Sequence, residues 1–63
     1  MKAVYIVIAC RDGSAEYYDI DSVWTSRRKA EKRRDELNGS ITEETILKTG
    51  CGFYDVVTMC VSV

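Results

Sequence analysis

The chain has 63 residues, of which 46% are hydrophobic and 30% are charged, and its formal net charge is −1. This composition excludes a disordered chain, and this length allows one domain with a thin core, over residues 1–63. The sequence holds no apolar run long enough to span a bilayer and no signal-peptide pattern at its start, so we expect a cytoplasmic protein that does not enter membranes.

The residue types that most catalytic and metal sites require are scarce in this chain. It has no histidine, and its three cysteines, Cys10, Cys51 and Cys60, lack the C-x-x-C spacing of zinc sites. Cys51 lies between two glycines and could be a reactive thiol, but Lys48 is the only nearby group that could activate it. We therefore expect free thiols, no metal, no cofactor and no enzymatic activity.

Two strands are predicted at the start of the chain, joined by the turn residues 11–14. Residues 3–10 form a continuous apolar run rich in β-branched side chains, which is typical of a strand buried on both faces. Residues 16–24 alternate between apolar and polar side chains, as a half-buried strand does. The first strand is therefore expected in the middle of its sheet.

Two registers are open for this hairpin. A two-residue loop would consist of Asp12 and Gly13, whereas a three-residue loop would begin at Arg11 and would pair Cys10 with Ser14. The three-residue loop is favoured because it gathers the larger apolar side chains of both strands on one face. That face would hold Val4, Ile6, Ile8, Tyr18, Ile20 and Trp24.

A helix is predicted over residues 26–38. Thr25 or Ser26 can cap its first turn, Ser26 by accepting a hydrogen bond from the backbone N–H of Lys29, and the Asn-Gly pair at its end is a stop signal. Ala30 and Leu37 form a narrow apolar stripe on this helix, which we expect to face the sheet.

The segment over residues 40–52 allows three interpretations: a long loop, a short strand over 45–48, or a helical turn that begins at Thr42. Residues 53–63 alternate again and are predicted to form the last strand. The expected fold class is therefore α+β in the order β-β-α-β. Three main strands form an antiparallel sheet in the order 2-1-3, with one helix packed on one face.

One helix can cover only one face of such a sheet. The face expected to stay open carries tyrosines and small apolar residues, and an open apolar patch usually marks a contact surface. We expect this patch to bury itself in a two-fold homodimer. The residues assigned to the dimer face are Tyr5, Val7, Tyr17, Tyr54 and Val56.

Charge is divided between two segments. Residues 26–38 hold six of the nine basic residues and three acidic ones, a surplus of three positive charges. Such a helix could contact nucleic acid or an acidic protein, or its charges could pair with one another in water. The hairpin is acidic, and it could imitate phosphate in the basic channel of a nucleic-acid enzyme or simply protect an edge strand. The candidate partner-binding residues are Arg28, Lys32 and Arg33 in the helix, and Asp12, Glu16, Asp19 and Asp21 in the hairpin.

A pattern of aromatic, capping and helix residues spans nearly the whole chain. It runs from VYIVIAC through WTSRRKAE to the last strand, and its residues are Tyr5, Trp24, Ser26, Lys29, Ala30, Glu31, Leu37 and Tyr54. The pattern resembles that of very small bacteriophage and prophage accessory proteins, from which Arg33, Arg34 and the segment 40–52 depart. The resemblance implies a fold more than an activity.

The resemblance also implies a setting. Small phage accessory proteins often inhibit host defence, as anti-CRISPR proteins do, so it implies a host protein, such as a CRISPR–Cas component, as the partner in the host cytoplasm. We therefore expect a small non-catalytic protein that binds and inhibits a host protein. The alternative is a small nucleic-acid-binding or regulatory protein that uses the basic helix over residues 26–38.

Overall fold

The computed structural model describes residues 2–13 and 16–61. These residues form three strands and two helices, and the strands join one antiparallel sheet in the order β2-β1-β3. The α+β class, the strand order and the central position of the first strand are confirmed. In chain order, the elements are β1 (Lys2–Arg11), β2 (Tyr17–Trp24), α1 (Arg27–Gly39), α2 (Glu43–Thr49) and β3 (Cys51–Val61).

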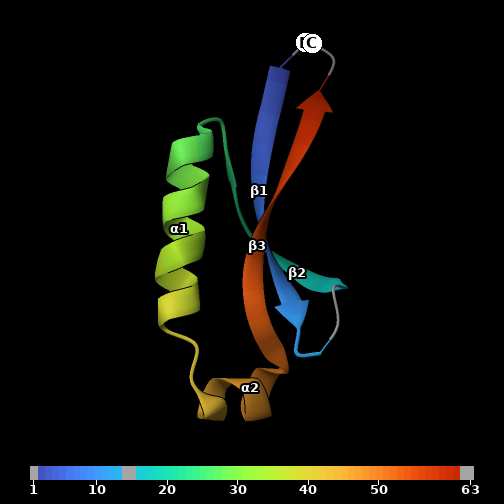
Figure 1. Ribbon diagram of the computed structural model, residues 1–63. Coiled ribbons are helices and arrows are strands. Elements are labelled where there is room, and N and C mark those ends of the chain that lie inside the picture. The colour runs from blue at the N-terminus through green and yellow to red at the C-terminus, as the bar shows by residue number, and fades with distance from the viewer. Residues whose placement is uncertain (1, 14–15, 62–63) are drawn as a thin grey trace.

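Figure 1 shows α1 running along one side of the sheet and α2 at the end where β3 begins. The prediction of a single helix is wrong, because residues 43–49 of the segment left open form a second one. Thr42 accepts a hydrogen bond from the N–H of Thr45 at 3.3 Å, and the two acidic residues of the first turn favour a helix start there. Of the three interpretations of this segment, the helical one holds.

Two glycines connect α2 closely to the hairpin and to β3. Gly50 ends α2 with a φ of 75°, a left-handed conformation that favours glycine, and its carbonyl accepts from the N–H of Asp12 at 2.8 Å. The backbone of Gly52 lies so close to Asp12 that an added Cβ would be 2.5 Å from the Asp12 Cα. The backbone at the junction of α2 and β3 therefore packs directly against the hairpin at one end of the sheet.

The register between β1 and β2 differs from both predicted hairpins. Cys10 pairs with Tyr17, three residues later than the favoured loop required. Two irregularities in the ladder leave Tyr18 and Asp21 as extra residues of β2. Such bulges redirect side chains, and here Asp21 meets Arg33 of α1. Contacts with the helix, which strand alternation does not record, therefore take part in setting this register.

α1 begins and packs as its sequence predicts. The Oγ of Ser26 accepts from the N–H of Lys29 at 3.4 Å, which confirms the predicted cap. Ala30 faces the sheet and is fully buried, while Leu37 is half-buried. Because alanine is so short, the backbone of α1 lies close to the strands.

The sheet has a covered face and an open face. Paired residues share a face, so the odd-numbered residues of β1 lie with the even-numbered residues of β3 on the covered face. Trp24 pairs with Tyr5 on this face and lines a depression together with residues of α1, which places the helix there. The open face consists of the even-numbered residues of β1, the odd-numbered residues of β3 from Phe53 onward, and their partners in β2.

The residues predicted as the dimer face do not form one face. Only Tyr17 lies on the open face, and the other four lie under or beside α1. Val7 is fully buried there, because short side chains at the centre of this face let the helix approach. The four misplaced residues are Tyr5, Val7, Tyr54 and Val56.

Candidate functional site

Half of the basic residues in α1 are held by carboxylates. Paired charges at exposed sites contribute little to stability, but they reduce the positive field that phosphate or an acidic surface would meet. Pairing within the helix therefore accounts for two of its six cations, and a third cation pairs with a carboxylate of β2. The three ion pairs are Arg27–Glu31 at 3.7 Å, Arg33–Asp21 at 3.1 Å and Arg34–Asp35 at 3.0 Å.

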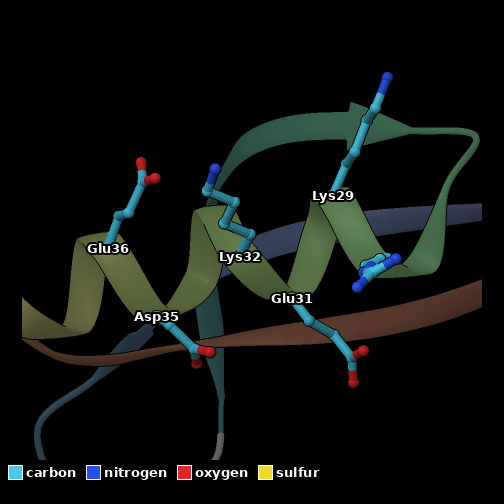
Figure 2. Close-up of a pocket in the computed structure, with 6 residues that line it drawn as sticks. Lys29, Glu31, Lys32, Asp35 and Glu36 are labelled. Atoms are coloured by element: carbon cyan, nitrogen blue, oxygen red, sulfur yellow. The ribbon is translucent and has the colours of Figure 1, made fainter.

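The other three cations surround a shallow depression on the outer side of α1 (Figure 2). Figure 2 shows Lys29, Lys32 and Glu36 extending to one side of the helix, and Glu31 and Asp35 to the other. Carboxylates therefore interrupt the positive charge, and the side chains point outward into solvent. The predicted residues Arg28 and Lys32 belong to this depression, and Arg33 does not. Its lining is Arg28, Lys29, Glu31, Lys32, Asp35 and Glu36.

Arg33 instead connects the two charged segments. Its Nε donates to Asp21 Oδ2 at 3.1 Å and its Nη2 donates to Asp21 Oδ1 at 3.4 Å, so β2 and α1 are joined at two points. The hydrogen bond from Arg33 holds the pKa of Asp21 below its ordinary value, and Asp21 in turn raises the pKa of Arg33. Two residues predicted for separate partner surfaces are therefore partners of each other.

The remaining acidic residues of the hairpin do not make a continuous strip. Asp19 accepts a hydrogen bond from the N–H of Ile20 at 2.9 Å. Asp12 and Glu16 are exposed at the end of the hairpin, where Arg11 also lies, with its guanidinium 5.5 Å from the centre of a tyrosine ring. A cation among these carboxylates weakens the predicted imitation of a phosphate chain.

The thiols of Cys10 and Cys51 lie near the start of β3, close to the side chains of Tyr18 and Tyr54. Cys10 and Cys51 are each 1% exposed, and burial raises the pKa of Cys10. Burial and the neighbouring Cys51 raise the pKa of Tyr54 to about 12, so its hydroxyl stays protonated at neutral pH. Lys48, the group that could activate Cys51, pairs with Glu44 at 2.8 Å. Within residues 2–13 and 16–61, no cluster of histidine, cysteine or carboxylate side chains could hold a metal ion.

The open face holds an apolar hollow of about 150 Å³. The lining side chains from β2 and β3 are partly in water, with an exposed fraction of 61% for Tyr17, 52% for Ile20, 51% for Met59 and 41% for Val57, while Ile8 at the floor is 8% exposed. Neither helix contributes to the lining, so this apolar surface has no cover among the described residues. The lining is Ile6, Ile8, Tyr17, Ile20, Val57 and Met59.

The positions of the alanines could have identified this face. Ala3 and Ala9 occupy odd-numbered positions of β1, and Ala30 lies on the helix stripe, so the short side chains share the covered face. The even-numbered positions of β1 carry longer side chains, including Ile6 and Ile8. A helix approaches the face with less bulk more closely, and therefore excludes water there more completely.

Comparison of the chain with protein families, with curated proteins and with solved structures found no match. No helix in the described part of the chain has the length and apolar character needed to cross a membrane.

Proposed function

We propose that this protein is a non-catalytic binding protein, and that a partner protein covers the open face of its sheet. The observation that supports this is the apolar hollow, whose side chains from β2 and β3 are 41% to 61% exposed. Exposed apolar area of this kind is costly in water and is typical of contact surfaces. Tyrosine and methionine are also enriched where proteins meet, because one is a rigid amphipathic anchor and the other adapts its shape.

The resemblance to small phage and prophage proteins supports a more specific partner. In this proposal the protein is a phage accessory protein in the host cytoplasm, and the partner is a host defence protein such as a CRISPR–Cas component. Binding through an apolar sheet face needs no catalytic residue, and a small inhibitor can act by occupying a surface that its target requires.

A second candidate function uses the outer side of α1. Arg28, Lys29 and Lys32 are exposed there and could contact the phosphates of a nucleic acid. The carboxylates in the same depression oppose such binding, and the sequence isoelectric point of about 5.2 is far below that of basic nucleic-acid-binding domains. The open sheet face is therefore the better supported site.

Affinity capture from a bacterial lysate with three tagged forms of the chain tests the two candidates against each other. The wild type and a variant with Arg28→Glu and Lys32→Glu should retain the same partner protein, and Val57→Lys should lose it. Circular dichroism establishes that both variants keep the fold, since all three positions are exposed. Loss of the partner by the helix variant alone, or salt-sensitive binding of duplex DNA that the helix variant alone abolishes, would contradict the proposal in favour of α1.

A further inference from the structure

The open face carries opposite charges toward its two ends. Lys2 pairs with Val61 at one end of the β1–β3 ladder, and Asp55 pairs with Ile8 six residues further along β1. Both charged residues belong to the open face, because they occupy even positions of β1 and odd positions of β3. The residues between them are apolar: Val4, Ile6, Val57 and Met59.

This arrangement is complementary to itself. A two-fold axis across the strands at the level of Tyr5, midway between Lys2 and Ile8, reverses the strand direction in a second copy. Lys2 of each copy then meets Asp55 of the other, and two such contacts flank an apolar centre. With the strands in the same direction across the interface, like charges would face each other instead.

We infer that in the free protein a second copy covers the open face, with the strands antiparallel across the interface. The inference rests on the proposed function, because it takes the open face to be a binding face and names its first occupant. A host partner would then compete with the second copy for the same surface. The homodimer expected from the sequence is kept in this proposal, and its interface moves to the opposite side of the sheet.

The exposed area suits such an interface. Seven apolar residues of the open face keep 37% to 61% of their surface in water. Five of these residues lie in the rows between Lys2 and Ile8, which a second copy with its axis at Tyr5 would face, and they form the apolar part of the contact. Packing two such faces at the usual ~10 Å separation of stacked sheets would give each copy a layer over the face that α1 leaves open. The seven residues are Tyr17, Ile20, Val23, Phe53, Val57, Met59 and Val61.

The hollow suits the same arrangement. β2 pairs with β1 only from Tyr5 to Cys10, so the rows of residues 2–4 and 59–61 extend beyond β2 as a two-stranded ribbon. With the axis at Tyr5, the row that contains Met59 faces the row that contains Val57 in the other copy. The flexible methionine side chain can then fill the hollow of about 150 Å³ beside Val57.

The sheet edges are less available for pairing than this face. Asn38 acts like a neighbouring strand: its side chain accepts from the N–H of Tyr54 at 2.7 Å and donates to the Tyr54 carbonyl at 3.2 Å. The Asp55 carboxylate accepts from the N–H of Val56 at 2.8 Å. On the edge formed by β2, the Asp19 carboxylate accepts a hydrogen bond from the N–H of Ile20. Side chains that occupy edge groups oppose strand addition, so face-to-face packing is favoured.

Sedimentation equilibrium of the wild type, Lys2→Glu, Asp55→Lys and the double charge swap tests the inference. The wild type should be dimeric at micromolar concentration. Each single variant should weaken the dimer at least about tenfold, since it places two like-charge contacts in the interface, and the double swap should recover most of the loss. Met59→Lys should weaken the dimer by removing its apolar centre, and Arg28→Glu on α1 should have no effect.

Three results would overturn the inference. The first is a wild type that stays monomeric up to about 1 mM, the affinity scale of a negligible interface. The second is a dimer that neither single charge variant changes, and the third is a dimer that Arg28→Glu disrupts. None of these results removes the proposed function, which fails separately if Val57→Lys still captures the partner protein. Circular dichroism of each variant excludes loss of the fold, because Lys2 and Asp55 are both exposed.

Discussion

The two faces of the sheet are built from similar residue types and yet have opposite roles. On the covered face, Val7 is fully buried and Ala9 is 5% exposed, and Ala30 of α1 is fully buried as well. On the open face, Val57 and Met59 are 41% and 51% exposed. The covered face carries the alanines of β1 as well as large aromatic side chains such as Trp24, so the presence of α1 rather than residue type separates the two faces. Apolar composition alone therefore does not indicate which face becomes the core.

Stability and binding are consequently divided between the faces. Among the described residues, the fully or nearly fully buried apolar side chains are few, which is expected for so short a chain. A change at a fully buried position of the covered face should therefore alter the free energy of unfolding, and a change at an exposed position of the open face should alter association. The buried set is Val7, Ile8, Ala9, Cys10, Ala30 and Cys51, of which Ile8 and Cys10 lie at even positions of β1.

The largest expected difference between the faces comes from matched truncations. Val7→Ala removes buried methyl groups beneath α1 and should lower the free energy of unfolding by about 2 kcal/mol, through lost burial and a residual cavity. Val57→Ala makes the same change on the open face and should cost less than about 1 kcal/mol, because this side chain is already partly in water. Urea denaturation measured at a concentration where the protein is monomeric checks both values.

Unfolding measured over a range of protein concentrations supplies the control for the Val7→Ala and Val57→Ala variants. If the open face binds a second copy, the cost of Val57→Ala should grow as protein concentration rises, because association stabilises the folded state by mass action. The cost of Val7→Ala should not depend on concentration in this way. Equal costs for the two variants in the monomer would contradict the assignment of the faces.

A smaller effect is expected at the edge where α1 holds β3. Asn38→Ala removes the acceptor for the N–H of Tyr54 and the donor to its carbonyl, and should cost about 1 kcal/mol because both bonds are exposed. Asn38→Asp keeps the acceptor and loses the donor, so it should fall between the wild type and the alanine variant. Thermal unfolding followed by circular dichroism ranks the three proteins.

The Asn38→Ala variant also distinguishes pairing at the edge of β3 from association through the open face. Asn38→Ala frees the edge of β3 at Tyr54, and should increase aggregation through strand pairing without altering the charge-dependent dimer of the open face. Light scattering over time separates this behaviour from a discrete dimer. An alanine variant with unchanged stability and solubility would mean that water replaces Asn38 without loss.

Much of the fold follows from local sequence. The long apolar run of β1, the serine cap of α1 and the alternation of β3 each depend on neighbouring residues, and each prediction is confirmed by the structure. α2 was one of three alternatives because its cap, Thr42, precedes only seven helical residues, and so short a helix depends on tertiary contacts. Residue periodicity is too weak a signal over that length.

The candidate site was harder to predict from the sequence, because it depends on the register between β1 and β2. The bulges of β2 make Tyr18 and Asp21 extra residues, and Asp21 reaches Arg33 of α1. No alternation pattern records an extra residue. The assignment of the open face was wrong because both faces are apolar, and the choice depends on how closely α1 approaches. The pairing of Arg33 with Asp21 crosses 12 positions in the sequence and depends on both of these features.

The smallest expected effect concerns this ion pair, which anchors α1 over the covered face. Arg33 lowers the pKa of Asp21 below the ordinary value of 3.8, so the folded state binds the proton of Asp21 less tightly than the unfolded state does. The resulting stabilisation is fully present above the unfolded pKa and is lost as the pH falls through the lower, folded pKa. The midpoint of thermal unfolding of the wild type should therefore exceed that of Asp21→Asn by a small margin at pH 7, and this margin should vanish under strongly acidic conditions.

Direct titration separates this cause from a general acid effect. The side-chain carboxyl carbon of Asp21, followed by NMR, should titrate below the ordinary range in the wild type and should return toward it in Arg33→Gln. Arg28→Gln removes an equal charge on the outer side of α1 and should leave the pKa of Asp21 nearly unchanged, since screening weakens charges that are not in contact. If both glutamine variants raised the pKa equally, the overall charge of α1 rather than the contact at 3.1 Å would set it. The helix would then be held over the covered face by apolar contact and its edge hydrogen bonds alone.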